Sequence, residues 1–263
     1  MSGLPILTYH SLDDSGRVTS TRPSWFLATM SALHSEGFRC VRLSEWVEAG
    51  RPDVERGFAL AFDDGLASIR LAADVLSKFD FAATAFLVSG RMGQTSDWDG
   101  TSSAEPILNW SELGDLRESG FDFGAHSLTH PRLGCCDPGR IAREVEESGR
   151  EIEDRTGEAC LLFAYPFGDA PRAARELVGR HFSAGFTTRL DQASGREALP
   201  AISRIDAYYL RSPRRLRAML SGRWMRELQA LRTARAVRRG IAVVGSVLRG
   251  YSSRAASVTA GGA

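Results

Sequence analysis

Strand-like and helical segments alternate along most of this chain, and the alternation constrains its fold more than any other feature. Short apolar runs typical of buried strands occupy residues 5–12, 57–64, 83–90, 121–127, 161–167 and 182–188. Between them, apolar side chains at helical spacing predict helices over 24–36, 67–79, 111–119, 138–156 and 170–180. Such a pattern is typical of an α/β fold built on a parallel sheet, which is either open or closed.

Composition narrows the class of protein. With 263 residues and 43% hydrophobic content, the chain is long enough to bury the core of one large domain. Its four cysteines, at 40, 135, 136 and 160, contain no CxxC pair and indicate neither a disulfide framework nor a cysteine zinc site. The opening MSGLPILTYHSL lacks the features of a signal peptide, and no apolar run is long enough to span a membrane. We therefore expect a cytoplasmic protein.

Charge is unevenly distributed along the chain. Residues 211–263 contain 12 arginines and one acid, Glu227, whereas residues 1–210 carry 21 basic and 31 acidic side chains. We expect a main domain over 1–210, an Arg-rich amphipathic helical extension over 211–250 and a disordered tail over 251–263.

The extension predicts one long helix from Pro213, with an apolar stripe at Leu216, Leu220, Trp224, Leu228 and Leu231. Two placements stay open for it: the helix lies on an anionic membrane surface, or its stripe packs on the main domain while the arginines stay solvated. Nucleic-acid binding is not expected, because the main domain is acidic and contains no reader motif.

Two adjacent carboxylates, Asp63 and Asp64, end the predicted strand in ALAFDDG. Like charges repel unless a cation lies between them, so the pair indicates a metal site; a solvated turn is the alternative. Other strand ends also carry polar groups, namely Tyr9, His10, His126, His130 and Tyr165. Because catalytic groups in parallel α/β folds gather at the carboxyl ends of strands, we expect one common site.

The segment HSLTHP places two histidines four residues apart. An isolated HxxxH is weak evidence for a metal site. With Asp64 as an oxygen ligand, however, His126 and His130 provide three protein ligands and leave an open position for water.

The segments AFDDG, HSLTHP and FAYPFG resemble, in order and approximate spacing, the motifs of the polysaccharide deacetylase family, carbohydrate esterase family 4 with its NodB homology domain. The resemblance covers about residues 4–206. The opening LTYHSL is similar to the branch that includes poly-N-acetylglucosamine deacetylases. The resemblance implies a distorted (β/α)₇ barrel.

The same resemblance implies roles for individual residues. Asp64, His126 and His130 match the metal ligands, usually of Zn²⁺, and Asp63 matches the general base. The backbone N–H of Phe167 matches a donor to the developing oxyanion.

Two departures from the family pattern affect this assignment. Ala164 stands where an arginine commonly pairs with the base; Arg204 is our candidate replacement, and a surface arginine paired with Asp206 is the alternative. No leucine-x-histidine motif supplies the proton donor for the leaving amine. His10 is our candidate for proton transfer or substrate binding, against a hydrogen-bonded barrel histidine.

Three aromatic residues are candidates for substrate binding: Tyr9, Tyr165 and Trp110. Tyr9 fits packing better than chemistry, and Trp110 is the one we would test first.

The leading functional hypothesis is a metal-dependent hydrolase that removes the acetyl group from an N-acetylated sugar in a polysaccharide, oligosaccharide or lipid-linked glycan. One alternative is a glycan-binding module that has lost its chemistry, which the missing arginine and histidine favour and the retained Asp63 opposes. Another is a hydrolase of a linear amide outside sugars.

Overall fold

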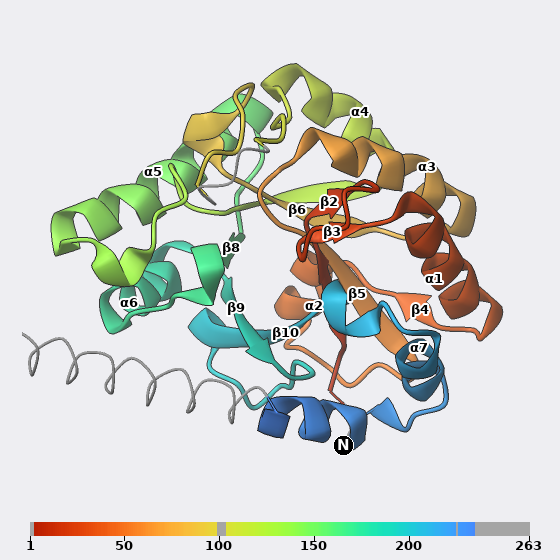
Figure 1. The fold of residues 1–263 in the computed structure, drawn as a ribbon. Helices are drawn as coiled ribbons and strands as arrows, with labels where there is room; N and C mark the ends of the chain where they lie inside the picture. The colour runs from red at the N-terminus through yellow and green to blue at the C-terminus, as the bar shows by residue number, and fades with distance from the viewer. Residues whose placement is uncertain (1–2, 99–103, 225, 235–263) are drawn as a thin grey trace, which may run out of the picture. The chain divides into compact units, whose positions relative to one another are not determined.

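The computed structural model describes residues 3–98, 104–224 and 226–234 (Figure 1). The chain divides into two compact units, Met1–Leu216 and Arg217–Ala263. The predicted site residues all belong to the first unit.

Seven parallel strands form a closed barrel in the first unit. They are β1 (Ile6–Tyr9), β5 (Gly57–Phe62), β6 (Ala83–Leu87), β7 (Phe121–Ala125), β8 (Leu162–Ala164), β9 (Ala184–Leu190) and β10 (Ile202–Asp206). The ring closes because Leu7 of β1 pairs with Leu60 of β5 on one side and Ile205 of β10 on the other. A short strand, β4 (Arg39–Cys40), pairs with the first two residues of β5. The expected seven-stranded barrel is confirmed.

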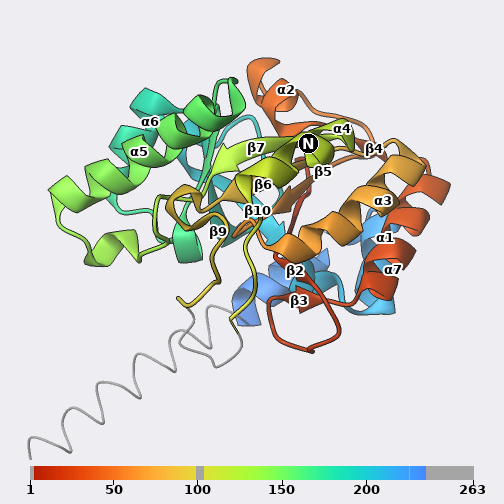
Figure 2. The same cartoon turned by 90° about the horizontal axis from the view of Figure 1, so that it is seen from above.

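Helices surround the barrel on its outside (Figures 1 and 2). They are α1 (Pro23–Ser35), α2 (Leu43–Glu48), α3 (Arg70–Phe79), α4 (Leu113–Glu118), α5 (Pro138–Thr156) and α6 (Arg172–His181). Helix α5 begins with the Asp137 side chain accepting a hydrogen bond from Arg140 N at 3.0 Å, and Pro138 occupies its first turn. It ends at Thr156 and is followed by the C-cap Gly157, whose φ of 72° lies in the left-handed region that glycine adopts most readily.

Alternate strand residues fill the barrel, because successive side chains of a strand point to opposite faces. Ile6, Ala59, Ala61 and Ile202 belong to one buried cluster, which Trp46 of α2 joins. Counted in steps of two along the chain, these positions lead to His10, Asp63 and Arg204. The same alternation therefore positions the site residues.

Two expectations about strands were wrong in detail. The first predicted strand is interrupted at His10: β1 ends at Tyr9, and a short strand β2 (Ser11–Leu12) pairs with β3 (Ser20–Thr21). Arg204 does not follow the last barrel strand but lies within β10, which the sequence analysis missed because Ser203, Arg204 and Asp206 interrupt its apolar pattern.

The single long helix expected from Pro213 was also wrong in the part that the structure describes. Helix α7 (Pro213–Leu220) stops at a turn where Gly222 has a φ of 70° and donates a hydrogen bond to Met219 O. A second helical stretch begins at Trp224. The rest of the predicted extension, from residue 235, and the tail over 251–263 lie outside the described residues. Among the described helices, none combines the length and apolarity that crossing a membrane requires.

Candidate active site

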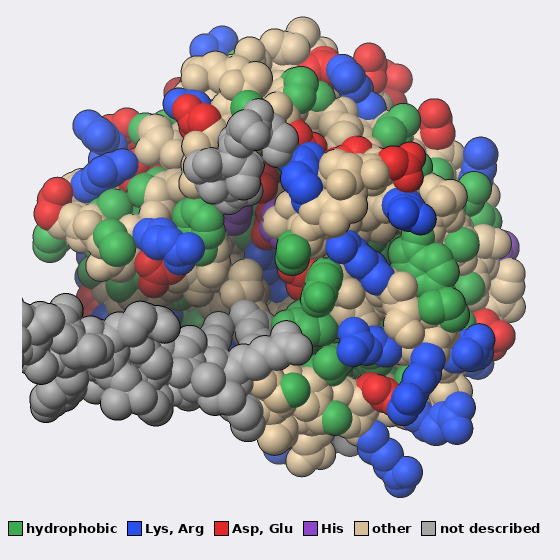
Figure 3. Space-filling model, viewed as in Figure 1, with side chains coloured by type: hydrophobic (Ala, Val, Ile, Leu, Met, Phe, Trp, Pro, Cys, Tyr) green, Lys and Arg blue, Asp and Glu red, His purple; other side chains and the backbone are tan. Residues whose placement is uncertain are grey.

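Asp64, His126 and His130 come together at the carboxyl ends of β5 and β7. The Asp64 Oδ1 atom lies 3.4 Å from His126 Nε2 and 3.2 Å from His130 Nε2, and all three side chains are buried. Their ligand atoms lie within 4.8 Å of one another, a spacing that a single metal ion can bridge. Histidine and acidic surface is visible in a hollow of the face shown in Figure 3.

The chemistry of this group fits a cation. His126 donates its Nδ1–H to the backbone oxygen of Ala164 at 2.7 Å, so a neutral ring presents a lone pair on Nε2 toward Asp64. A ring lone pair and a carboxylate oxygen facing each other at this distance repel unless a positive charge lies between them. Burial lowers the pKa of His130 more than neighbouring Asp64 raises it, which favours the neutral, ligating form of that ring.

Left-handed backbone conformations place the ligands. Asp64, Ser127, His130 and Phe167 have φ values of 71°, 62°, 62° and 57°, although none is glycine. Each such residue costs about 1–3 kcal/mol, and such conformations cluster at functional sites. Asp64 and Gly65, which has a φ of 63°, are both left-handed, so the chain turns sharply at these two residues.

Glu144 of α5 supports the loop between the two histidines, and the sequence analysis missed it. Its buried carboxylate accepts hydrogen bonds from Leu128 N at 3.0 Å, Thr129 N at 2.8 Å and Thr129 Oγ1 at 2.5 Å. The sequence did contain one sign of this role: Glu144 comes three residues after the buried Ile141 and so lies on the apolar face of the helix.

We expect Glu144→Ala to destabilise the protein and weaken metal binding. The substitution removes the carboxylate that accepts hydrogen bonds from the partly buried N–H groups of Leu128 and Thr129, a loss of about 0.5–1.5 kcal/mol each, and it frees the loop that carries His130. Urea unfolding and zinc titration of this variant, with the exposed Glu147→Ala as control, measure both effects. Unchanged zinc affinity would show that Glu144 does not position the histidine loop.

Asp63 forms a buried, two-pronged ion pair with Arg204. The two Asp63 oxygens lie 2.7 Å from Nη1 and 2.8 Å from Nη2 of Arg204, and both residues are 2% exposed. Burial would raise the pKa of Asp63, but the Arg204 charge outweighs it and holds the pKa below its usual value. Arg204 therefore pairs with Asp63, as the sequence analysis expected, whereas Asp206 accepts a hydrogen bond from Tyr208 N at 2.8 Å.

His10 is half-buried at the end of β1, in the row that leads to the site. Burial alone would lower its pKa, but the negative charges of Asp64, Asp63 and Asp206 outweigh burial and raise the pKa above that of a free histidine. The ring is thus suited to hold a proton near neutral pH.

Phe167 lies in the one-turn 3-10 helix η5 (Pro166–Gly168) after β8. Its ring contacts the His130 ring at a centroid distance of 4.7 Å. As the second residue of so short a helix, it has an N–H that the helix itself leaves free. The Phe167 side chain therefore lies beside the ligand group, and its backbone N–H stays our predicted donor to the substrate.

The structure shows where the three aromatic candidates lie. Tyr9 is buried against Phe26 and Phe62, and Tyr165 is buried with its hydroxyl donating to Pro200 O at 2.7 Å, so both are core residues. Trp110 lies beside Arg155 of α5.

Trp98, like Phe167, is an aromatic residue that lies at the site. Its ring lies 4.4 Å from that of His130, centroid to centroid. The sequence signal was the dipeptide DW at 97–98, which cannot be distinguished from a packing aromatic without the fold.

Comparison with known proteins agrees with this geometry. Residues 50–182, just over half of the chain, match the family model described as polysaccharide deacetylase. The chain belongs to the polysaccharide deacetylase family. The matched segment contains Asp63, Asp64, both histidines and Phe167, while His10, directly after β1, and Arg204, on β10, lie outside it. No curated protein matches the chain at a significant level.

Solved structures share the fold at low sequence identity. IcaB from Ammonifex degensii is 23% identical, with a TM-score of 0.70 over 85% of this chain and 97% of its own. The deacetylase PplD of Streptococcus pyogenes, solved with acetate, is 22% identical, with a TM-score of 0.68 over 78% and 92%. BC0361, a polysaccharide deacetylase from Bacillus cereus, is 22% identical, with a TM-score of 0.70 over 83% and 69%. These likenesses show the barrel fold; the branch within the family stays a prediction.

Proposed function

We propose that this polysaccharide deacetylase is a metal-dependent enzyme that removes the acetyl group from an N-acetylated sugar within a glycan. The carrying observation is the buried Asp64–His126–His130 group beside the Asp63–Arg204 ion pair. Two imidazoles and one carboxylate form a ligand set that suits Zn²⁺. When bound, the ion supplies a Lewis acid and lowers the pKa of water toward about 7.

Residues of the chain itself carry out the proton transfers and stabilise the developing negative charge. Asp63 accepts a proton from the water that attacks the acetamide carbonyl, while Arg204 keeps the carboxylate ionised and oriented. The Phe167 N–H donates a hydrogen bond to the carbonyl oxygen as negative charge develops on it. His10 gives its proton to the nitrogen as the carbon–nitrogen bond breaks, which releases acetate and an amino sugar.

The Asp63–Arg204 pair argues against a module that only binds glycans. Burying two charges is costly, and such a pair is poor evidence for added stability. A pure binding protein has no use for an oriented, ionised carboxylate beside a metal ligand. The pair therefore favours catalysis.

Acetate release distinguishes the proposed substrate from other amides. We expect turnover of N-acetylglucosamine oligomers and little or none of N-acetyl-lysine, with an enzyme-linked acetate assay as the measurement. Turnover of the lysine amide at an equal rate would instead support a hydrolase of non-sugar amides.

His10→Gln tests the proton donor. We expect kcat to fall by about 10²–10⁴-fold. Wild-type activity should decline as pH rises through the His10 pKa, because the ring loses the proton that it donates, and this decline should be absent from the residual activity of the variant. The exposed His34→Gln of α1 serves as control. A variant that keeps the alkaline decline and the wild-type kcat would exclude His10 as the donor.

A further inference from the structure

A cavity that is lined by no residue of the metal group lies at the start of α1. It has a volume of about 420 Å³ and is lined by Gly16, Ser20, Arg22, Ser24, Trp25 and Arg211. The proposed chemistry uses none of these residues.

The segments that line the cavity come after β1 and β10 in the chain, the two strands that position His10 and Arg204. The segment 11–25 comes directly after His10 at the end of β1, and Arg211 follows β10 through the 3-10 helix η7 (Ala207–Leu210). Since β1 and β10 are neighbouring parallel strands, their carboxyl ends share one rim of the barrel. The cavity therefore lies on the same rim of the barrel as the catalytic group.

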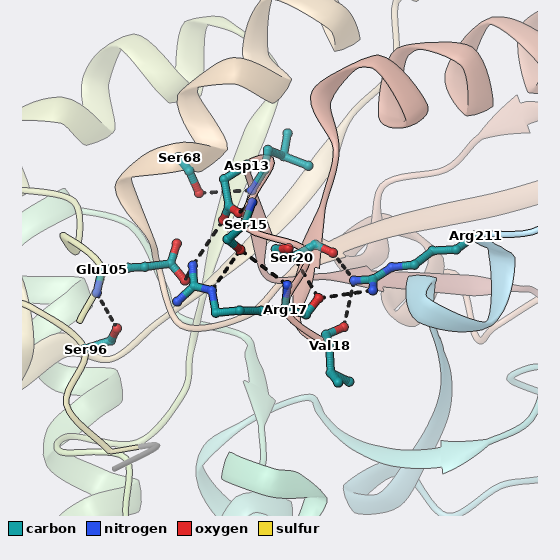
Figure 4. A network of polar contacts seen from close by, with 10 residues as sticks. Asp13, Ser15, Arg17, Val18, Ser20, Ser68, Ser96, Glu105 and Arg211 are labelled. Atoms are coloured by element: carbon teal, nitrogen blue, oxygen red, sulfur yellow. Dashed lines mark hydrogen bonds and ion pairs between the residues drawn. The ribbon is translucent and has the colours of Figure 1, made fainter. Parts of the chain in front are cut away.

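Polar contacts hold the loop over residues 13–20 in place (Figure 4). Arg17 contacts the Asp13 carboxylate at 3.1 Å and the Ser15 hydroxyl at 3.0 Å, and it also forms an ion pair with Glu105. The Arg17 charge is thus neutralised by Asp13 and Glu105. A wall held in this way is formed before a ligand arrives, which reduces the entropic cost of binding.

Arg211 has no acidic partner among the described residues. Its guanidinium donates to the carbonyl oxygens of Arg17 at 3.1 Å, of Val18 at 2.7 Å and of Ser20 (Figure 4). Neutral carbonyls orient the guanidinium but leave its positive charge uncompensated.

Arg22 adds a second positive charge to the cavity. Its nearest acid is Asp14 at 3.9 Å, and both side chains are more than 70% exposed, so this pair contributes little. Arg22 also precedes α1 as its N-cap without a side-chain cap, so the helix start faces no negative side chain there. Ser20 and Ser24 provide hydroxyl groups, and the Trp25 indole provides a flat face for a sugar ring.

We propose that this cavity binds an oxyanion, a phosphate or a carboxylate, carried by the glycan whose acetyl group the enzyme removes. Two guanidinium groups with hydroxyls between them recognise such groups through charge-assisted hydrogen bonds. The inference rests on the proposed function for the glycan and on the cavity alone for the anion.

A binding experiment tests the anion site independently of activity. Calorimetric titration of the zinc-loaded protein with inorganic phosphate should show saturable binding that weakens about tenfold or more in Arg22→Gln. The exposed Arg172→Gln of α6 is the matched control and should bind as the wild type does. Phosphate bound at the metal group would persist unchanged in Arg22→Gln, and that result would overturn the site.

A kinetic experiment tests the glycan. Acetate release is measured on neutral N-acetylglucosamine oligomers, on the same oligomers ending in a phosphate and on oligomers ending in a carboxylate. We expect at least one charged series to show a lower KM at similar kcat, and Arg22→Gln to remove this advantage without changing turnover of the neutral series. The charged series with the lower KM identifies the anion as a phosphate or a carboxylate.

The two failures are distinguishable. Arg22-dependent phosphate binding with equal KM values for all oligomers would show a site for a free anion and overturn the glycan assignment. If no oligomer releases acetate, the proposed function fails, and the phosphate titration still decides whether the cavity binds anions.

Discussion

Asp63→Asn is expected to reduce acetate release by about 10²–10⁴-fold, the usual contribution of a general base. An amide has nearly the same shape as the carboxylate but cannot accept the proton from the attacking water. The metal ligands Asp64, His126 and His130 are unchanged, so zinc content should stay at the wild-type level. The measurements are kcat on N-acetylglucosamine oligomers and zinc per chain by mass spectrometry.

Asp74→Asn, an exposed substitution on α3, is the control for this experiment. The Asp63 variant also leaves Arg204 without its carboxylate, so its free energy of unfolding must be measured alongside activity. Undiminished turnover in a folded, zinc-loaded Asp63→Asn protein would exclude Asp63 as the base.

Arg204→Met is expected to lower the free energy of unfolding at neutral pH by about 3–5 kcal/mol, because it leaves the buried Asp63 charge without a partner. In the wild type, the pKa of Asp63 is lower in the folded state than in the unfolded state. The ion pair therefore stabilises the fold at pH values above the unfolded-state pKa of Asp63. This stabilisation is lost as the pH falls through the folded-state pKa of Asp63. In the variant, burial without Arg204 raises the Asp63 pKa, so acidification should relieve part of the loss.

Urea unfolding at pH 7 and pH 5 measures this effect. Arg204→Lys keeps the charge but not the two-pronged geometry, so it should fall between the wild type and Arg204→Met. The exposed Arg143→Met on α5 is the control. A loss in Arg204→Met no larger than in the control would show that the buried pair does not stabilise the native state.

The barrel and the ligand group could be predicted because their signals are local. Strand and helix periodicity needs only a window of a dozen residues, and the Asp pair and HSLTHP each lie within a few residues of a strand end. Parallel topology then brings those strand ends to one rim without further information.

The rest of the site depends on contacts between distant segments. Arg204 reaches Asp63 across 141 residues only because the barrel closes through β1 and β10. Glu144 has the sequence appearance of an ordinary helical acid, and its three hydrogen bonds to the histidine loop appear only in the fold. The sequence analysis chose Trp110, whereas the tryptophan that contacts His130 is Trp98, because which one reaches the site depends on how the loops pack.

Metal removal and return test the central claim most directly. We predict that purified protein contains about one zinc or similar ion per chain, that chelation abolishes acetate release from N-acetylglucosamine oligomers, and that one equivalent of Zn²⁺ restores it. The His126→Ala, His130→Ala double variant should neither retain the ion nor regain activity. Acetate release that persists at the full rate in metal-free protein would contradict the account.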